Sequence, residues 1–103
     1  MAEKLDSRAI ALRYANEVKK NCNVVQLFLF GSTASGQNHA DSDIDIAVVA
    51  QDFSGDRVED TLRLMKMRRN IDLRIEPHAF LPNDFHQGNP FAAEIMQHGI
   101  RIV

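Results

Sequence analysis

Two apolar segments of the chain are joined by the stretch Phe30-Gly31-Ser32-Thr33-Ala34-Ser35-Gly36-Gln37-Asn38-His39-Ala40-Asp41-Ser42-Asp43-Ile44-Asp45. It opens with a small-residue turn at Gly31-Ser32 and closes, ten residues later, with the carboxylates of Asp43 and Asp45. Glycine permits a sharp turn or a close approach of the backbone to another group. The stretch therefore predicts a strand, a turn and a second strand that begins with acidic side chains.

The two apolar segments read as neighbouring parts of a sheet. Residues 24–30 are β-branched and aromatic and too short for a typical helix, which indicates a central strand buried on both faces. From Asp43 to Ala50 the side chains alternate, so Ile44, Ile46 and Val48 share one face, and Asp43 and Asp45 share the other.

The remaining elements are predicted from helical periodicity, capping residues and turn signals. A helix over residues 6–21 is expected to carry Leu5, Leu12, Ala15 and Val18 on one broad side. A helix over 56–69 is expected to bury the stripe Val58, Leu62 and Met65 in the core. A third strand is predicted over 71–76 and ended by Pro77, followed by a helix from Pro90 to Gly99 and a terminal strand over 100–103. Residues 1–103 are thus expected to form a single α/β (α+β) domain with helices packed against a small sheet.

Composition narrows the class of function. The 103 residues are 45% apolar and 25% charged, as in an ordinary globular protein, and the net charge of -2 disfavours a direct nucleic-acid binder with a general basic field. The single cysteine, Cys22, has no partner for an internal disulfide. The sequence shows neither a signal peptide nor a run long enough to span a membrane, so a cytoplasmic location is expected.

The acidic pair points to metal chemistry. Residues two apart on a strand face the same way, with Cα atoms about 6.5–7 Å apart, so Asp43 and Asp45 would repel each other without a cation. Carboxylate oxygens are the ligands that Mg²⁺ prefers. Asp72 interrupts the apolar alternation of the third predicted strand and is expected as a third carboxylate. Three carboxylates can hold two ions about 3.5–4 Å apart, as in two-metal nucleotidyl transfer.

Gly31 and Ser32 are expected to bind phosphate. A glycine lets the backbone approach the anion, a helix that starts at Ser32 offers free N–H groups, and the serine hydroxyl can donate a hydrogen bond. Gly-Ser alone occurs in many turns and Asp-x-Asp alone is often a solvated strand end. The combination, with a later aspartate on a strand, is far more specific and favours a catalytic site.

Phe30-Gly31-Ser32 followed by Asp43-Ile44-Asp45 resembles the signature of the DNA polymerase β-type nucleotidyltransferase superfamily, and the short chain as a whole resembles its minimal nucleotidyltransferase (MNT) domain. The resemblance implies a nucleotidyltransferase fold with a mixed sheet. It implies Asp43, Asp45 and Asp72 as catalytic metal ligands for Mg²⁺, and Gly31 and Ser32 as residues that bind the nucleoside triphosphate.

The resemblance also implies a partner. Minimal nucleotidyltransferases act as antitoxins beside helical toxins of the higher eukaryotes and prokaryotes nucleotide-binding (HEPN) family, and transfer AMP from ATP to a toxin tyrosine (AMPylation). Two alternatives stay open: transfer to a small molecule such as an aminoglycoside, and a non-catalytic antitoxin that acts by binding alone. Homo- and hetero-oligomers are both compatible with this interpretation.

One departure from the resemblance concerns the triphosphate. Many relatives carry arginine just after Gly-Ser, where this chain has Thr33-Ala34-Ser35. Arg74 is a candidate replacement because it shares the predicted face of Asp72. The alternative is that Arg74 forms a salt bridge with Asp72 or Glu76. His39 could touch substrate or be a solvated loop residue, and its role stays open.

Overall fold

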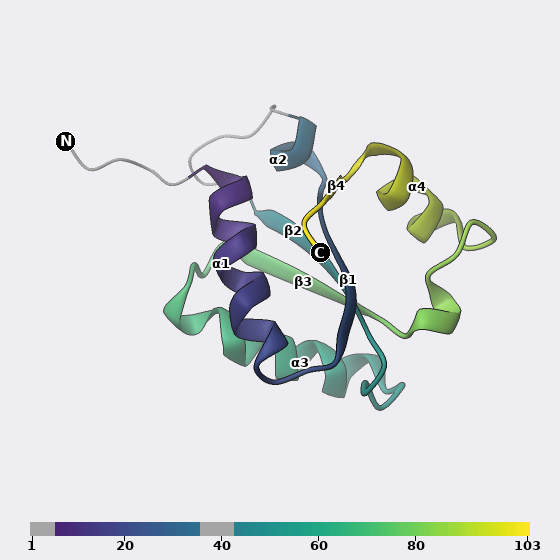
Figure 1. Ribbon diagram of the computed structural model, residues 1–103, viewed down its shortest axis with the longest axis horizontal. Coiled ribbons are helices and arrows are strands. Elements are labelled where there is room, and N and C mark those ends of the chain that lie inside the picture. The colour runs from purple at the N-terminus through teal and green to yellow at the C-terminus, as the bar shows by residue number, and fades with distance from the viewer. Residues whose placement is uncertain (1–5, 36–42) are drawn as a thin grey trace.

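The computed structural model describes residues 6–35 and 43–103 (Figure 1). His39, considered above as a residue that touches substrate or lies in a solvated loop, is outside the described part of the chain, as is Leu5. Along the described residues the order of elements is the expected alternation of helices and strands. They are α1 (Ser7–Lys19), β1 (Val24–Phe30), α2 (Ser32–Ser35), β2 (Ile44–Ala50), α3 (Arg57–Met67), β3 (Ile75–Phe80), α4 (Pro90–His98) and β4 (Ile100–Arg101), with 3₁₀ turns η1 (Arg68–Asn70) and η2 (Pro82–Asp84).

The described strands form a four-stranded sheet in the order β3-β2-β1-β4. β1 pairs antiparallel with both β2 and β4, whereas β2 pairs parallel with β3. The sheet is therefore mixed, and the prediction of a small mixed sheet with helices packed against it is confirmed. β1 and β2 are its inner strands, as their apolar sequences predicted.

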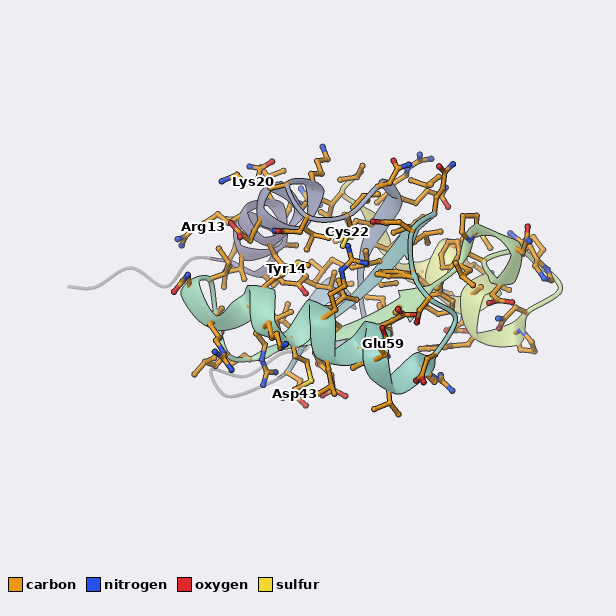
Figure 2. All side chains as sticks on the ribbon, turned by 90° about the horizontal axis from the view of Figure 1, so that it is seen from below. Arg13, Tyr14, Lys20, Cys22, Asp43 and Glu59 are labelled. Atoms are coloured by element: carbon orange, nitrogen blue, oxygen red, sulfur yellow. The ribbon has the colours of Figure 1, made fainter. Side chains whose placement is uncertain are left out.

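One face of the sheet is covered by α1 and α3, which lie on the same side in Figure 1. The buried residues between them include Leu27, Ile46 and Leu64. Tyr14 of α1 is fully buried and its hydroxyl donates a 2.7 Å hydrogen bond to the carbonyl of Leu64 in α3. Figure 2 shows Tyr14 between the two helices, while Arg13 and Lys20 point away from the core. Burial raises the pKa of the Tyr14 phenol, so this donor keeps its proton.

The opposite face carries a smaller core beneath α4. Its members are aromatic or small residues: Phe28, Ala47, Val49, Phe80, Phe85, Ala92 and Ile95. Because side chains alternate along a strand, the same face continues from Val49 and Ala47 to Asp45 at the start of β2. The acidic residues thus lie at the end of a face whose other end is filled by α4.

Helix α4 has the predicted limits. Asn89 caps it by accepting hydrogen bonds from the backbone N–H groups of Phe91 and Ala92, and Pro90 stands at the first helical position. Gly99 closes it, with its N–H donating to the carbonyl of Ile95. A Cβ at residue 99 would lie 2.5 Å from that carbonyl oxygen and 3.0 Å from the carbonyl oxygen of Leu29, so only glycine lets α4 turn this close to β1.

The predicted third strand is wrong in position. β3 spans Ile75–Phe80, and Asp72 lies in the turn before it. Pro77 does not end the strand: it sits inside it, opposite Ile46 of β2. Proline is tolerated there because β3 is an edge strand, where a missing N–H removes no ladder bond on the open side.

The predicted core stripe of the middle helix is also wrong. Val58 is 69% exposed and Leu62 is 53% exposed. On the predicted apolar side of α1, Ala15 and Val18 are buried, whereas Leu12 is 53% exposed. The face of α3 that packs on the sheet instead carries Asp60 and Leu64. The buried Asp60 carboxylate accepts hydrogen bonds from the backbone N–H groups of Ser54 and Gly55 and from the Ser54 hydroxyl. These hydrogen bonds compensate for the burial of the carboxylate.

In the described part of the chain, every helix is too short or too polar to cross a membrane.

Candidate active site

The candidate site lies where β1 ends and β2 begins. Phe30, the last residue of β1, pairs with Asp45 across the antiparallel ladder, and Gly31 follows it directly. On the other side of β2, Asp45 stands in parallel register with Glu76 of β3. The sheet therefore places Asp45 between residues that come fifteen positions before it and thirty-one positions after it in the sequence.

Gly31 is in direct contact with this carboxylate. Its φ of +79° is in the left-handed region, which favours glycine. A Cβ built on Gly31 would lie 2.5 Å from Asp45 Oδ2. Two independent constraints, backbone conformation and space, thus require glycine at this position. Phosphate binding by Gly31 stays a prediction.

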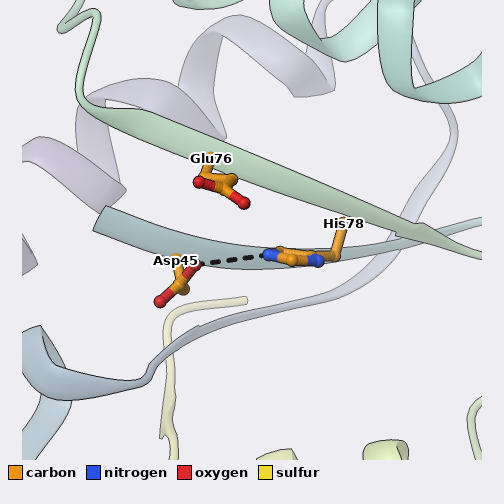
Figure 3. Close-up of side chains that lie close together, drawn as sticks. All are labelled: Asp45, Glu76 and His78. Atoms are coloured by element: carbon orange, nitrogen blue, oxygen red, sulfur yellow. Dashed lines mark hydrogen bonds and ion pairs between the residues drawn. The ribbon is translucent and has the colours of Figure 1, made fainter. Parts of the chain in front are cut away.

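Asp45, Glu76 and His78 form a compact group, with one ligand atom from each lying within 4.8 Å of the others (Figure 3). The Nε2 of His78 lies 3.3 Å from Asp45 Oδ1, and since a carboxylate only accepts, the imidazole donates this hydrogen bond. Glu76 and His78 are two residues apart on β3 and therefore face the same side as Asp45.

Asp43 adds a further acidic group. It precedes β2, is exposed, and shares a hydrogen bond with Glu76. This hydrogen bond raises the pKa of Glu76, and burial and the charges of Asp43 and Asp45 act in the same direction, against a smaller opposing effect of His78. Carboxylates placed this close together form an arrangement that a bound cation would stabilise.

The donor set fits a hard divalent cation. Asp43, Asp45 and Glu76 offer carboxylate oxygens, which suit Mg²⁺. Imidazole is a less usual ligand for Mg²⁺, and the hydrogen bond from His78 instead orients the Asp45 carboxylate, in the way that neighbouring groups commonly fix metal ligands. These residues could therefore hold a divalent cation, and the magnesium site expected at Asp43, Asp45 and Asp72 stays a prediction.

Asp72 is not brought into this group. Its carboxylate forms an ion pair with Arg74, with Nη2 to Oδ2 at 2.8 Å and Nε to Oδ1 at 3.0 Å, and Oδ1 also accepts from the Arg74 N–H. These hydrogen bonds lower the pKa of Asp72. Of the two readings of Arg74, the salt bridge to Asp72 is the one that the structure shows. Asp72 starts the turn into β3, and the carboxylate that β3 places in register with Asp45 is Glu76.

Ser32 is the first residue of α2 and is exposed beside Gly31. Its placement next to the acidic group is compatible with phosphate binding, which stays a prediction. Sequence reasoning missed Glu76 and His78. Their signal was the alternation Glu76-x-His78-x-Phe80 on one side and Ile75-x-Pro77-x-Ala79 on the other, which Pro77 obscured.

Three solved structures resemble the chain. A toxin–antitoxin structure with AMP-PNP gives a TM-score of 0.62 at 22% identity over 96% of this chain and 73% of that chain. A mutant of the toxin–antitoxin MntA-HpeT gives 0.60 at 20% identity over 96% and 73%. A candidate nucleotidyltransferase from Sulfolobus solfataricus gives 0.53 at 22% identity over 82% and 81%. At these identities the likeness establishes the fold.

A search of curated proteins finds no match. The family model described as polymerase beta, nucleotidyltransferase matches residues 14–103. The match covers the end of β1, the acidic start of β2 and the whole of β3, the elements that build the site. The chain therefore belongs to the polymerase beta nucleotidyltransferase family.

Proposed function

We propose that the chain is a Mg²⁺-dependent nucleotidyltransferase that uses ATP and modifies a partner protein. The observation that carries the proposal is the contact of Gly31 with Asp45, in register with Glu76. It places a tight glycine turn, which the resemblance assigns to phosphate binding, beside carboxylates for a cation at one end of an inner strand. Family membership supports transferase activity in general, and the structural neighbour with AMP-PNP supports a nucleoside triphosphate as the donor.

The proposed reaction forms a bond between an acceptor oxygen and the α-phosphorus of ATP. The bond from that phosphorus to the β-phosphate bridging oxygen breaks, pyrophosphate leaves, and the acceptor hydroxyl releases its proton to solvent. Bound Mg²⁺ would neutralise phosphate charge and lower the pKa of the acceptor hydroxyl. Asp43, Asp45 and Glu76 would hold the cation, His78 would keep Asp45 in place, and Gly31 with Ser32 would receive the phosphates.

The proposed acceptor is a tyrosine of a helical HEPN-family toxin, and the chain would be its antitoxin. Two structural neighbours are toxin–antitoxin structures, and in one of them two aspartates two positions apart are changed to glutamate, the spacing that Asp43 and Asp45 have here. This likeness supports the proposal for the partner. The AMP transfer itself is the step to be measured.

The test incubates purified protein with Mg²⁺, each of the four labelled nucleoside triphosphates and the product of the neighbouring gene. Label on the partner with wild type and with Asp72→Asn, and none with Asp45→Asn or Glu76→Gln, would support the proposal. Complete neutralisation of the partner by an unlabelled Asp45→Asn complex would instead show an antitoxin that acts by binding. Label on an aminoglycoside without the partner would identify a small-molecule transferase.

A further inference from the structure

An aromatic wall stands beside the acidic group. It consists of Phe30 from β1, His78 from β3 and Phe91 from α4. The three rings contact one another in edge-to-face geometry, with centroid distances of 5.1 Å between Phe30 and His78, 5.6 Å between Phe30 and Phe91, and 5.7 Å between His78 and Phe91. His78 links this wall to the acidic group, because the same imidazole donates to Asp45.

Further aromatic residues pack against the aromatic wall. Behind it, Phe80 contacts both Phe91, at 5.6 Å, and Phe85, at 5.1 Å, and Phe80 and Phe85 are buried. Phe91 is held in the first turn of α4 by the Asn89 cap, which accepts its backbone N–H at 3.0 Å. Its side chain is nevertheless 38% exposed. A large ring that is held by aromatic neighbours and is still partly exposed could offer surface for stacking.

The position of the Phe91 ring near the acidic group indicates which class of ligand it could bind. One end of the site, at Asp43, Asp45 and Glu76, suits a cation with phosphates, and the adjoining surface, one ring away, is aromatic. A molecule that joins a polyanion to a flat aromatic group would satisfy both, and a nucleoside triphosphate is such a molecule. Stacking of a base on an aromatic side chain contributes about 1–3 kcal/mol.

We propose that Phe91, supported by Phe30 and His78, is the seat of the nucleotide base. This inference rests on the proposed function and deepens it by assigning the base end of the same site. Stacking tolerates any base, because every base has an aromatic face. ATP and GTP are therefore expected to bind with similar affinity unless residues of the partner distinguish them.

The experiment compares two probes, ATP and inorganic tripolyphosphate, by calorimetry with Mg²⁺ and the full chain. Tripolyphosphate has the phosphates but no base. Phe91→Ala is expected to weaken ATP binding about 5- to 150-fold, which is the stacking energy converted to affinity, and to leave tripolyphosphate binding within about twofold. Phe91→Leu, which keeps an apolar side chain of similar bulk, should behave like Phe91→Ala, whereas Phe91→Trp should retain ATP binding. Leu73→Ala, an exposed apolar position away from the wall, is the matched control.

Other binding results would contradict either the role of Phe91 or the proposed function. If Phe91→Ala weakens both probes equally, the ring only supports the fold and the base seat is wrong. If Phe91→Ala leaves ATP binding unchanged, or if the wild type binds tripolyphosphate as tightly as ATP, stacking is excluded while the proposed function stands. If the wild type binds neither probe, the proposed function fails and takes the base seat with it.

Discussion

At the scale of single residues, the candidate site depends on Gly31 and on the residues around Asp45. Gly31 excludes every side chain, since its left-handed φ and the nearby Asp45 oxygen both act against a Cβ. Asp45 is the centre of the group because Gly31, Glu76 and His78 all contact it or share its register. The strongest predictions at this scale therefore concern Gly31 and the carboxylates around Asp45.

Gly31→Ala is expected to abolish nucleotidyl transfer and to lower the free energy of unfolding by about 1–3 kcal/mol, the usual cost of a strained non-glycine residue. The added methyl group would displace the Asp45 carboxylate. Transfer assays and urea unfolding measure the two effects. Gly55→Ala is a useful control: Gly55 also has a positive φ, but a Cβ there would meet only a Leu81 methyl group at 3.8 Å. It should lose stability and keep activity, and inactivity of both variants would contradict the contact argument.

Glu76→Gln and Asp72→Asn distinguish the observed site from the one predicted from sequence. Glu76 lies with Asp45, whereas Asp72 is engaged by Arg74. Mg²⁺ is expected to raise the melting temperature of wild type and of Asp72→Asn, because a ligand that binds only the folded state stabilises it. Glu76→Gln should lose that shift. A shift that survives in Glu76→Gln and disappears in Asp72→Asn would restore Asp72 as the third ligand.

At the scale of elements, periodicity identified each helix but could not choose its buried face. In α3 the positions 58, 62 and 65 have helical spacing, and so do 60, 64 and 67. The first set is apolar and looked like the core stripe. The second contains Asp60, whose hydrogen-bond donors lie in the preceding loop and are invisible in a sequence pattern. The buried face of α3 could therefore not be recognised from the sequence, because it contains the charged residue Asp60.

Leu62→Gln and Leu64→Ala test this assignment on one helix. Leu62 is half exposed, so Leu62→Gln should change the free energy of unfolding by no more than about 0.5 kcal/mol. Leu64 is fully buried, so Leu64→Ala should cost about 2–5 kcal/mol through lost burial and a cavity. Urea unfolding measures both. A larger cost for Leu62→Gln than for Leu64→Ala would show that α3 packs with the predicted stripe inward.

The inner strands were predicted correctly from the sequence, whereas the edge strand β3 was misplaced. β1 and β2 were predicted from their own residues because inner strands are apolar on both faces. β3 was placed four residues too early, since Ile71, Leu73 and Ile75 alternate as a strand would and Pro77 looked like its end. Only the position of β3 at the edge of the sheet makes Pro77 acceptable. The misplaced strand is also why Asp72, and not Glu76, was expected beside Asp45.

At the scale of the whole molecule, a polar network joins segments that meet at the end of the sheet opposite the candidate site. Arg63 of α3 donates to the carbonyl of Asn21 at 2.6 Å and to the Asp52 carboxylate at 3.1 Å, and Asp52 accepts the N–H of Asn23 at 2.9 Å. The network thus ties the residues after α1, the start of β1 and the loop after β2 to α3. It contributes to stability without touching the acidic group.

The pH dependence of stability should report this network. The hydrogen bond from the Asn23 N–H, followed by that from Arg63, lowers the pKa of Asp52. A carboxyl whose pKa is lower in the folded state stabilises the fold above its unfolded pKa of about 3.9, and this contribution is lost as pH falls through the lower folded value. Asp52→Asn is therefore expected to destabilise the protein at pH 7, by no more than about 1 kcal/mol because both partners are partly exposed.

The difference in free energy of unfolding between wild type and Asp52→Asn should shrink below about pH 4 and vanish once Asp52 is protonated in both the folded and the unfolded state. Urea unfolding from pH 7 to pH 2 measures it, with Asp84→Asn as a control outside the network, and a difference that stays constant with pH would show that the charge of Asp52 is not what holds these segments together.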